Sequence, residues 1–221
     1  MHISEGVLTA PVLAAGAVLT VGGLAVGLKK MDYEKLPEVG VLSSVFFVAS
    51  LIHVPIGPSA AHLVLNGICG LLLGWLAFPA IFVGLALQAV LFEFGGLTTL
   101  GVNTFNMAFP AVVLGYLCTR FIKSPSTAVR AVAEFVAGAG AILCSGLLVA
   151  GSLFLALGES IDAAARLIVL AHIPVMIVEG LITVFVIEFI RRVRPEMLFQ
   201  SVGSPLAGSE QQETMRNQAE G

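Results

Sequence analysis

The first two residues of the chain, Met1 and His2, set three nitrogen donors side by side. These are a free α-amine, a backbone amide and an imidazole, and together they can enclose a small cation in fused chelate rings. One more imidazole would complete a square of nitrogens. That geometry suits Ni(II) and Cu(II), and low-spin Co(II) also accepts it, whereas Mg(II) and Ca(II) prefer oxygen ligands. The residue types therefore predict a clamp for a late first-row divalent ion.

This clamp requires that the mature chain keeps its first residue. The opening segment MHISEGVL has no basic start, carries Glu5 and shows no small-residue cleavage site, so it does not resemble a secretory signal. The bulky side chain of His2 should also block removal of Met1. In the competing interpretation, Met1 is only the start residue and His2 is a frayed side chain at a chain end. The rest of the sequence favours the clamp.

The composition predicts an integral membrane protein. Of the 221 residues, 57% are hydrophobic and 11% are charged, whereas a soluble domain has about 25% charged residues. Apolar segments close to the roughly 20 residues that cross a bilayer predict an all-α fold of about seven transmembrane helices. These segments are 7–28, 38–54, 61–77, 80–94, 104–122, 131–157 and 165–190. The third and fourth segments are short, and the number of spans becomes six if they act as one bent pair.

The lysines and arginines give the expected orientation. With seven spans and the N-terminus outside, Arg166 is the only one of the 11 basic residues that faces outward, as the positive-inside rule requires. The C-terminus then lies inside. Residues 1–195 are predicted to form a transmembrane metal-binding domain, and residues 196–221 a polar cytoplasmic tail that we expect to be disordered.

All four histidines of the chain fall in the outer half of the membrane in this topology. His53 and His62 flank the sequence PIGPS, and His172 lies near the outer end of the last span. Imidazole is a common metal ligand, and ionisable groups at membrane depth are costly enough to suggest function. His62 is the favoured fourth ligand. His53 is the alternative ligand, or a neighbour that orients the others by hydrogen bonding, and His172 is expected to make a helix-packing hydrogen bond.

Several polar residues lie close to these histidines in sequence. Asn66 is one helical turn after His62 and could orient it or the terminal segment. Asn103 ends a connector, GGLTTLGVN (95–103), that could close over the terminus as a lid or could simply supply turn geometry. Glu93 precedes this connector and could meet a cation or a histidine. Glu179, in the last span, has no role assigned from sequence.

Three motifs resemble the CbiM/NikM family, and CbiM most of all. They are MHISEG at the start, HLVLNG at 62–67, and GGLTTLGVN at 95–103 with Met107 after it. Members are the substrate-binding membrane subunits of energy-coupling-factor cobalt and nickel importers, and the resemblance covers about residues 1–195. It implies that the metal is held by the N-terminal amine, by the backbone nitrogen and imidazole of His2, and by His62. Many relatives have a longer stretch where this chain has PIGPSAA, which leaves the choice between His53 and His62 open.

The resemblance also implies partners and a location. The partners are a CbiQ-like transmembrane coupling protein, CbiO-like ATPase subunits and a small CbiN-like auxiliary subunit, all in or at the bacterial cytoplasmic (inner) membrane. The chain has no GxxxxGK[ST] motif, so ATP hydrolysis is expected from the partner subunits. We expect no catalytic residues, no catalytic cofactor and no nucleic-acid partner. Co(II) or Ni(II) is the transported cargo.

Two other functions compete with this one. A gradient-driven divalent metal permease would need buried carboxylates along a path, and Glu93 and Glu179 are the only candidates. A membrane metalloenzyme would need an open coordination position and a nearby acid or base, and a square of four nitrogens leaves no easy place for a substrate. The sequence favours the importer subunit. Cobalt is narrowly preferred to nickel, because the short unfused tail resembles the cobalt branch of the family.

Overall fold

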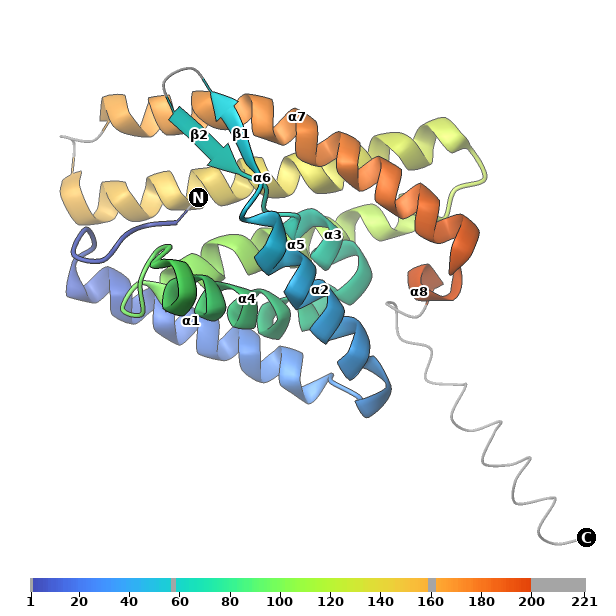
Figure 1. Cartoon of the computed structure of the whole chain (residues 1–221), viewed down its shortest axis with the longest axis horizontal. Coiled ribbons are helices and arrows are strands. Elements are labelled where there is room, and N and C mark those ends of the chain that lie inside the picture. The colour runs from blue at the N-terminus through green and yellow to red at the C-terminus, as the bar shows by residue number, and fades with distance from the viewer. Residues whose placement is uncertain (1, 57–58, 159–161, 200–221) are drawn as a thin grey trace, which may run out of the picture.

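The computed structural model describes residues 2–56, 59–158 and 162–199, and the side chains of residues 53–61, 162–171 and 199 lie outside that description. Long apolar helices make up most of the described chain (Figure 1). They are α1 (Ala10–Lys29), α2 (Leu36–Ala49), α4 (Ala77–Phe92), α5 (Leu100–Ile122), α6 (Thr127–Leu157) and α7 (Asp162–Val193). The shorter elements are the helices α3 (Asn66–Leu73) and α8 (Glu196–Phe199), the 3-10 turns η1 (Tyr33–Lys35) and η2 (Gly74–Leu76), and the strands β1 (His53–Ile56) and β2 (Ser59–His62).

The predicted helical membrane fold is confirmed. Five described stretches are long and apolar enough to cross a bilayer, namely Ala10–Lys29, Asn66–Phe92, Leu100–Ile122, Thr127–Leu157 and His172–Val193. Large apolar side chains on these helices are exposed, among them Leu155 and Phe185 at 74% each. Such surfaces are unfavourable in water but match lipid acyl chains. Four of the predicted spans (7–28, 104–122, 131–157 and 165–190) correspond to α1, α5, α6 and α7.

The segments predicted at 61–77 and 80–94 form a pair that enters the bundle and returns. Helix α3 has 8 residues, all of them buried. It ends at Leu73, because Gly74 adopts φ 54, and the chain continues through η2 into α4. The chain just before α3 approaches His2 through His62, and the chain just after α4 approaches His2 through Phe94. The two ends of the pair therefore lie on the same side of the bundle. This agrees with the alternation of seven segments predicted from the charges.

Glycines allow α3 to sit in the centre of the helices. A Cβ atom at Gly70 would overlap the backbone of Ala111 on α5, and one at Gly67 would overlap the backbone of Ala137 and Gly138 on α6. Small residues permit this close approach of helices in membranes. Helix α3 is thus enclosed by other parts of the protein, since all of its residues are buried.

The end of the predicted second span is not helical. Helix α2 ends at Ala49, and the chain continues into an antiparallel hairpin of β1 and β2 in which His53 lies opposite His62. The apolar pattern predicted helix up to residue 54 and again from residue 61, and both predictions are wrong. Pro55 has no amide hydrogen and disfavours the helical conformation in the residue before it, so the chain becomes extended here.

An ion-pair cluster joins α6 and α7 at the end of the bundle away from His2. The Arg130 Nε atom lies 3.0 Å from Glu188 Oε1, and Arg191 pairs with Glu188 at 3.3 Å and with Glu134 at 2.9 Å. Glu188 thus pairs with two arginines, one from each helix. The cluster joins the N-terminal part of α6 to the C-terminal part of α7.

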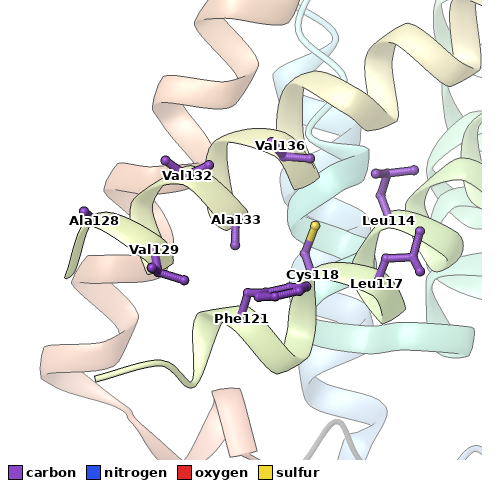
Figure 2. A pocket seen from close by; sticks show the side chains of 9 residues that line it. All are labelled: Leu114, Leu117, Cys118, Phe121, Ala128, Val129, Val132, Ala133 and Val136. Atoms are coloured by element: carbon purple, nitrogen blue, oxygen red, sulfur yellow. The ribbon is translucent and has the colours of Figure 1, made fainter. Parts of the chain in front are cut away.

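An apolar groove of about 560 Å³ lies between α5 and α6 near the same end (Figure 2). Its lining includes Leu114, Leu117, Cys118 and Phe121 from α5 and Val129 and Val132 from α6. Several of these side chains are at least half exposed. The groove suits lipid acyl chains, and it lies at the opposite end of the helices from His2.

Helix α8 ends the described part of the chain. Its Leu198 is 2% exposed and belongs to the main apolar core. The predicted tail overlaps this helix and continues into residues 200–221, which lie outside the described residues. The division into a domain of residues 1–195 and a tail of residues 196–221 therefore stays a prediction.

Candidate metal centre

The N-terminal segment is docked on the start of α5. The backbone N–H of Ile3 donates to Asn103 Oδ1, and the Asn103 amide Nδ2 donates back to the Ile3 carbonyl, each at 3.0 Å. Nδ2 is also 3.2 Å from the hydroxyl of Thr99. The side chain of Ile3 is 4% exposed and packs with Leu8 and Val102. The segment that carries His2 is therefore held by both its backbone and its side chains.

The connector between α4 and α5 forms one wall beside this segment. Gly95 adopts φ 82, and a Cβ atom there would crowd the Asn103 amide and the His2 side chain. The backbone N–H of Thr98 donates to Glu5 Oε1 at 3.2 Å. The connector thus packs on the N-terminal segment, as the lid interpretation expected, and its glycine provides unusual backbone angles, as the turn interpretation expected.

His2 and His62 lie against each other. Their ring centroids are 4.7 Å apart with an interplanar angle of 17°, and the ring of Phe94 lies 6.2 Å from His2 on centroids. Nitrogen ligands bind transition metals at about 2 Å, so two donors on one ion lie within about 4 Å of each other. Rings this close can meet one ion through side-chain rotation.

The two ring nitrogens of His2 are buried, although the residue as a whole is only partly buried. Within the described residues, neither Nδ1 nor Nε2 of His2 has a partner. Burial, with repulsion from His62 as a smaller cause, lowers the pKa of His2 from 6.5 to about 2. A neutral ring is the form that binds metals, because one of its nitrogens then carries a free lone pair that a bound proton would block. A buried polar group without a partner is costly, and a metal ion would relieve that cost here.

The ring of His62 has a defined orientation. Its Nδ1 atom lies 2.9 Å from the carbonyl oxygen of Leu63. Because a carbonyl oxygen can only accept, Nδ1 must donate, and Nε2 is then the nitrogen with a lone pair. Metal-binding histidines are commonly fixed in this way by a hydrogen bond from the other ring nitrogen.

The other predicted site residues are distributed as follows. Met1 lies outside the described residues, and so does the side chain of His53, whose backbone on β1 is opposite His62. Asn66 is 0% exposed and donates to the Met107 carbonyl at 3.1 Å and to Ser145 Oγ at 3.0 Å, so its amide nitrogen points into the bundle and not toward the histidines. Of the predicted site residues, the structure places His2 against His62, and it places Asn103 against the backbone of Ile3, next to His2.

The structure also gives the positions of Glu93 and Glu179, whose roles could not be assigned from the sequence. Glu93 is exposed and adopts φ 57 at the C-terminal end of α4. Glu179 is 0% exposed and accepts hydrogen bonds from the backbone of Val64 and Leu65. The contact of Glu179 with Val64 and Leu65 could not be predicted from the sequence, because a pairing over more than 100 positions leaves no local pattern. The contact of Phe94 with His2 was also not predicted, although the motif GGLTTLGVN directly follows Phe94.

Asn103→Leu should release the N-terminal segment. The change removes two hydrogen bonds, each worth about 1 kcal/mol, and leaves the buried Ile3 amide unpaired at a cost of about 1–3 kcal/mol. Since about 1.4 kcal/mol is tenfold in affinity, we expect binding of Co(II) to weaken by about 10- to 100-fold in calorimetric titration.

Asn106→Leu is the matched control for this variant. Asn106 lies one turn further along α5, is 3% exposed and donates to Ser152 on α6 at 3.3 Å. It makes no described contact with the N-terminal segment. Equal losses of affinity in the two variants would contradict a specific role of Asn103.

The fold and the site together define a class of protein. Apolar helices that are long enough to cross a bilayer carry a partly buried pair of stacked imidazoles at the docked N-terminal segment. This is the arrangement of a multi-pass membrane protein that handles a transition metal. The chain matches the family model described as "Cobalt uptake substrate-specific transmembrane region" over residues 2–197. It belongs to this family, CbiM, and the resemblance read from its motifs is confirmed.

Relatives and solved structures agree with this assignment. A putative metal transport protein of Haemophilus influenzae is 44% identical over 90% of this chain and 97% of its own length. The cobalt transport protein CbiM of Kyrpidia tusciae is 30% identical over 94% of this chain and 90% of its own length. A crystal structure of a transition metal transporter is similar with a TM-score of 0.69 at 28% identity, covering 87% of this chain and 93% of that chain. The chain is thus a membrane component of cobalt or nickel transport, as predicted.

Proposed function

We propose that this chain is the substrate-specific subunit of an ATP-driven energy-coupling-factor importer, and that it captures Co(II) outside the bacterial cytoplasmic membrane. The ligands are the Met1 amine, the amide and ring nitrogens of His2, and the Nε2 atom of His62. The observation that carries the proposal is the His2 ring, whose buried nitrogens have no described partner and which lies 4.7 Å from His62 on centroids.

The chemistry of the donors supports a late first-row ion. A set made only of nitrogens disfavours Mg(II) and Ca(II), and a planar arrangement suits Ni(II) and Co(II). Among the described residues, no three His, Cys, Asp or Glu side chains gather into a metal-binding group. This accords with a donor set that includes backbone nitrogens. Nickel as the main cargo is the alternative, and the same ligands would serve it.

Energy would come from partner subunits. The proposed partners are a CbiQ-like coupling protein, CbiO-like ATPases and a CbiN-like auxiliary subunit. Fused nickel transport proteins among the relatives, such as the putative NikMN of Archaeoglobus fulgidus, are longer than this chain, which aligns with 68% of that protein. A gradient-driven permease is the competing function. In the described structure, Glu179 is bound to backbone amides and Glu93 is exposed at a helix end.

Cellular uptake of radiolabelled cobalt separates the two functions. Cells should accumulate cobalt when this chain is expressed with its coupling protein and intact ATPases, and a protonophore should leave that uptake largely unchanged while ATP persists. An ATPase variant unable to hydrolyse ATP should abolish uptake. Uptake by this chain alone that collapses with the protonophore would support the permease and reject the importer subunit.

A further inference from the structure

A buried glutamate of α7 contacts the chain segment that follows His62. The Glu179 side chain is 0% exposed. Its Oε1 atom accepts a short hydrogen bond from the Val64 backbone N–H, and both of its oxygens lie 3.0 Å from the backbone nitrogen of Leu65. The carboxyl group therefore holds two consecutive amides just before α3.

One of these amides belongs to the peptide unit that also binds His62. The carbonyl of Leu63 lies 2.9 Å from His62 Nδ1, and the N–H of the same peptide unit, on Val64, donates to Glu179. The carboxyl group, the peptide unit and the imidazole thus form a continuous hydrogen-bonded chain. Hydrogen bonds in such chains polarise one another in a low-dielectric interior, so the carboxyl group strengthens the bond that fixes the ring.

The position of Glu179 is itself fixed by close helix packing. Its carbonyl oxygen accepts from the Thr183 hydroxyl at 2.7 Å. A Cβ atom at Gly138 on α6 would overlap the Thr183 hydroxyl and crowd the Glu179 carbonyl, and one at Gly67 on α3 would overlap the backbone of Gly138. Helices α3, α6 and α7 therefore meet at this point with little room to move. The backbone of Glu179 is therefore held in place by helix packing while its carboxyl group contacts the segment after His62.

Capping of helix α3 is the alternative role for Glu179, and it explains fewer of the observed contacts. Leu65 is the N-terminal cap position of α3, adopts φ 56 and makes no side-chain cap of its own. The first amides of a helix need partners, above all in a membrane, and Glu179 is the partner of the Leu65 amide. Capping explains the bond to Leu65. It does not explain why the adjoining amide, which belongs to the peptide unit that contacts His62, is held by the same carboxyl group.

We propose that Glu179 is a positioning residue for the metal ligand His62. Through the Leu63–Val64 peptide unit it keeps the proton of His62 on Nδ1 and the lone pair on Nε2. The proposal rests on the proposed function in one respect, namely that His62 binds the metal. The tautomer of His62 in the metal-free protein can be measured without that assumption.

The test compares Glu179→Ala and Glu179→Gln with Glu188→Gln on the same helix. Glutamine keeps one acceptor oxygen, whereas alanine keeps none, and Glu188 lies in the ion-pair cluster away from the site. In metal-free protein with ¹⁵N-labelled histidine, nitrogen shifts should show the Nδ1–H form of His62 in the wild type and a mixture of both tautomers in Glu179→Ala. The His62 signals are identified by their loss in His62→Ala. Cobalt affinity should fall by about 10- to 100-fold in Glu179→Ala, less in Glu179→Gln, and little in Glu188→Gln.

Double variants separate positioning from general stability. If Glu179 acts through His62, adding Glu179→Ala to His62→Ala should cause almost no further loss of affinity, because coupled residues are not additive. A full additional loss, or an unchanged tautomer in Glu179→Ala, would overturn the proposal. Should Glu179→Ala not fold, as judged by gel filtration and thermal unfolding, the same two criteria apply to Glu179→Gln. If His62→Ala alone binds cobalt normally, the proposed function fails, and the tautomer measurement still decides the positioning.

Discussion

Inserting several residues, the first of them leucine, between Met1 and His2 should abolish tight binding of Co(II) and Ni(II). The bulky leucine at the second position keeps Met1 in place, and the insertion separates the α-amine from the His2 amide and ring by several peptide units, so these donors can no longer share fused chelate rings around one ion. Loss of a group that only orients a ligand typically weakens binding by about 10- to 100-fold, and the insertion removes a direct ligand. We therefore expect a loss of at least about 100-fold, measured by calorimetric titration of the purified protein.

The same peptide inserted between Glu5 and Gly6 is the matched control. These residues are exposed, and a Cβ atom at Gly6 would meet nothing within 4 Å. The control lengthens the same segment but keeps His2 and the hydrogen bonds between Ile3 and Asn103. Its affinity should stay close to that of the wild type. Unchanged binding in the first insertion, or equal losses in both, would reject a clamp at the terminus.

His62→Ala should have the next largest effect, and His53→Ala should have a much smaller one. His62 lies 4.7 Å from His2 on ring centroids, and its Nδ1 bond to the Leu63 carbonyl leaves Nε2 for the metal. We expect at least about 100-fold weaker cobalt binding in His62→Ala, because the loss of a ligand exceeds the effect of an orienting group. The visible spectrum of bound Co(II) should also change, since one nitrogen donor is replaced.

His53→Ala is an internal control because His53 lies directly opposite His62 in the hairpin. Both changes remove an imidazole from paired positions of the same two strands. If His53 only orients its neighbours, His53→Ala should weaken cobalt binding by no more than about tenfold, which is the low end of the range for orienting groups. A larger loss in His53→Ala than in His62→Ala would reverse the assignment of the fourth ligand.

Part of the site could be predicted from the sequence because its donors are local. Met1 and His2 are adjacent, so their chelating capacity follows from covalent geometry alone. Asn103 was singled out by its place in a polar connector between apolar segments, and the structure brings it to Ile3. Asn66 was singled out by its spacing from His62. Spacing predicts a shared helix face only if both residues are helical, and His62 lies on a strand while α3 begins at Asn66.

The sequence by itself determined the membrane class, the family and the apolar segments, because composition and local motifs are properties of the chain that no packing can alter. The tertiary structure decided how the third and fourth segments reverse, where the hairpin replaces helix, and which distant groups meet. The ring stacking of His2 on His62 and the reach of Glu179 to Val64 join positions 60 and 115 residues apart. The contact of Glu179 depends on the glycines Gly67 and Gly138, which let α3, α6 and α7 approach closely, so its partner is fixed only when those helices pack.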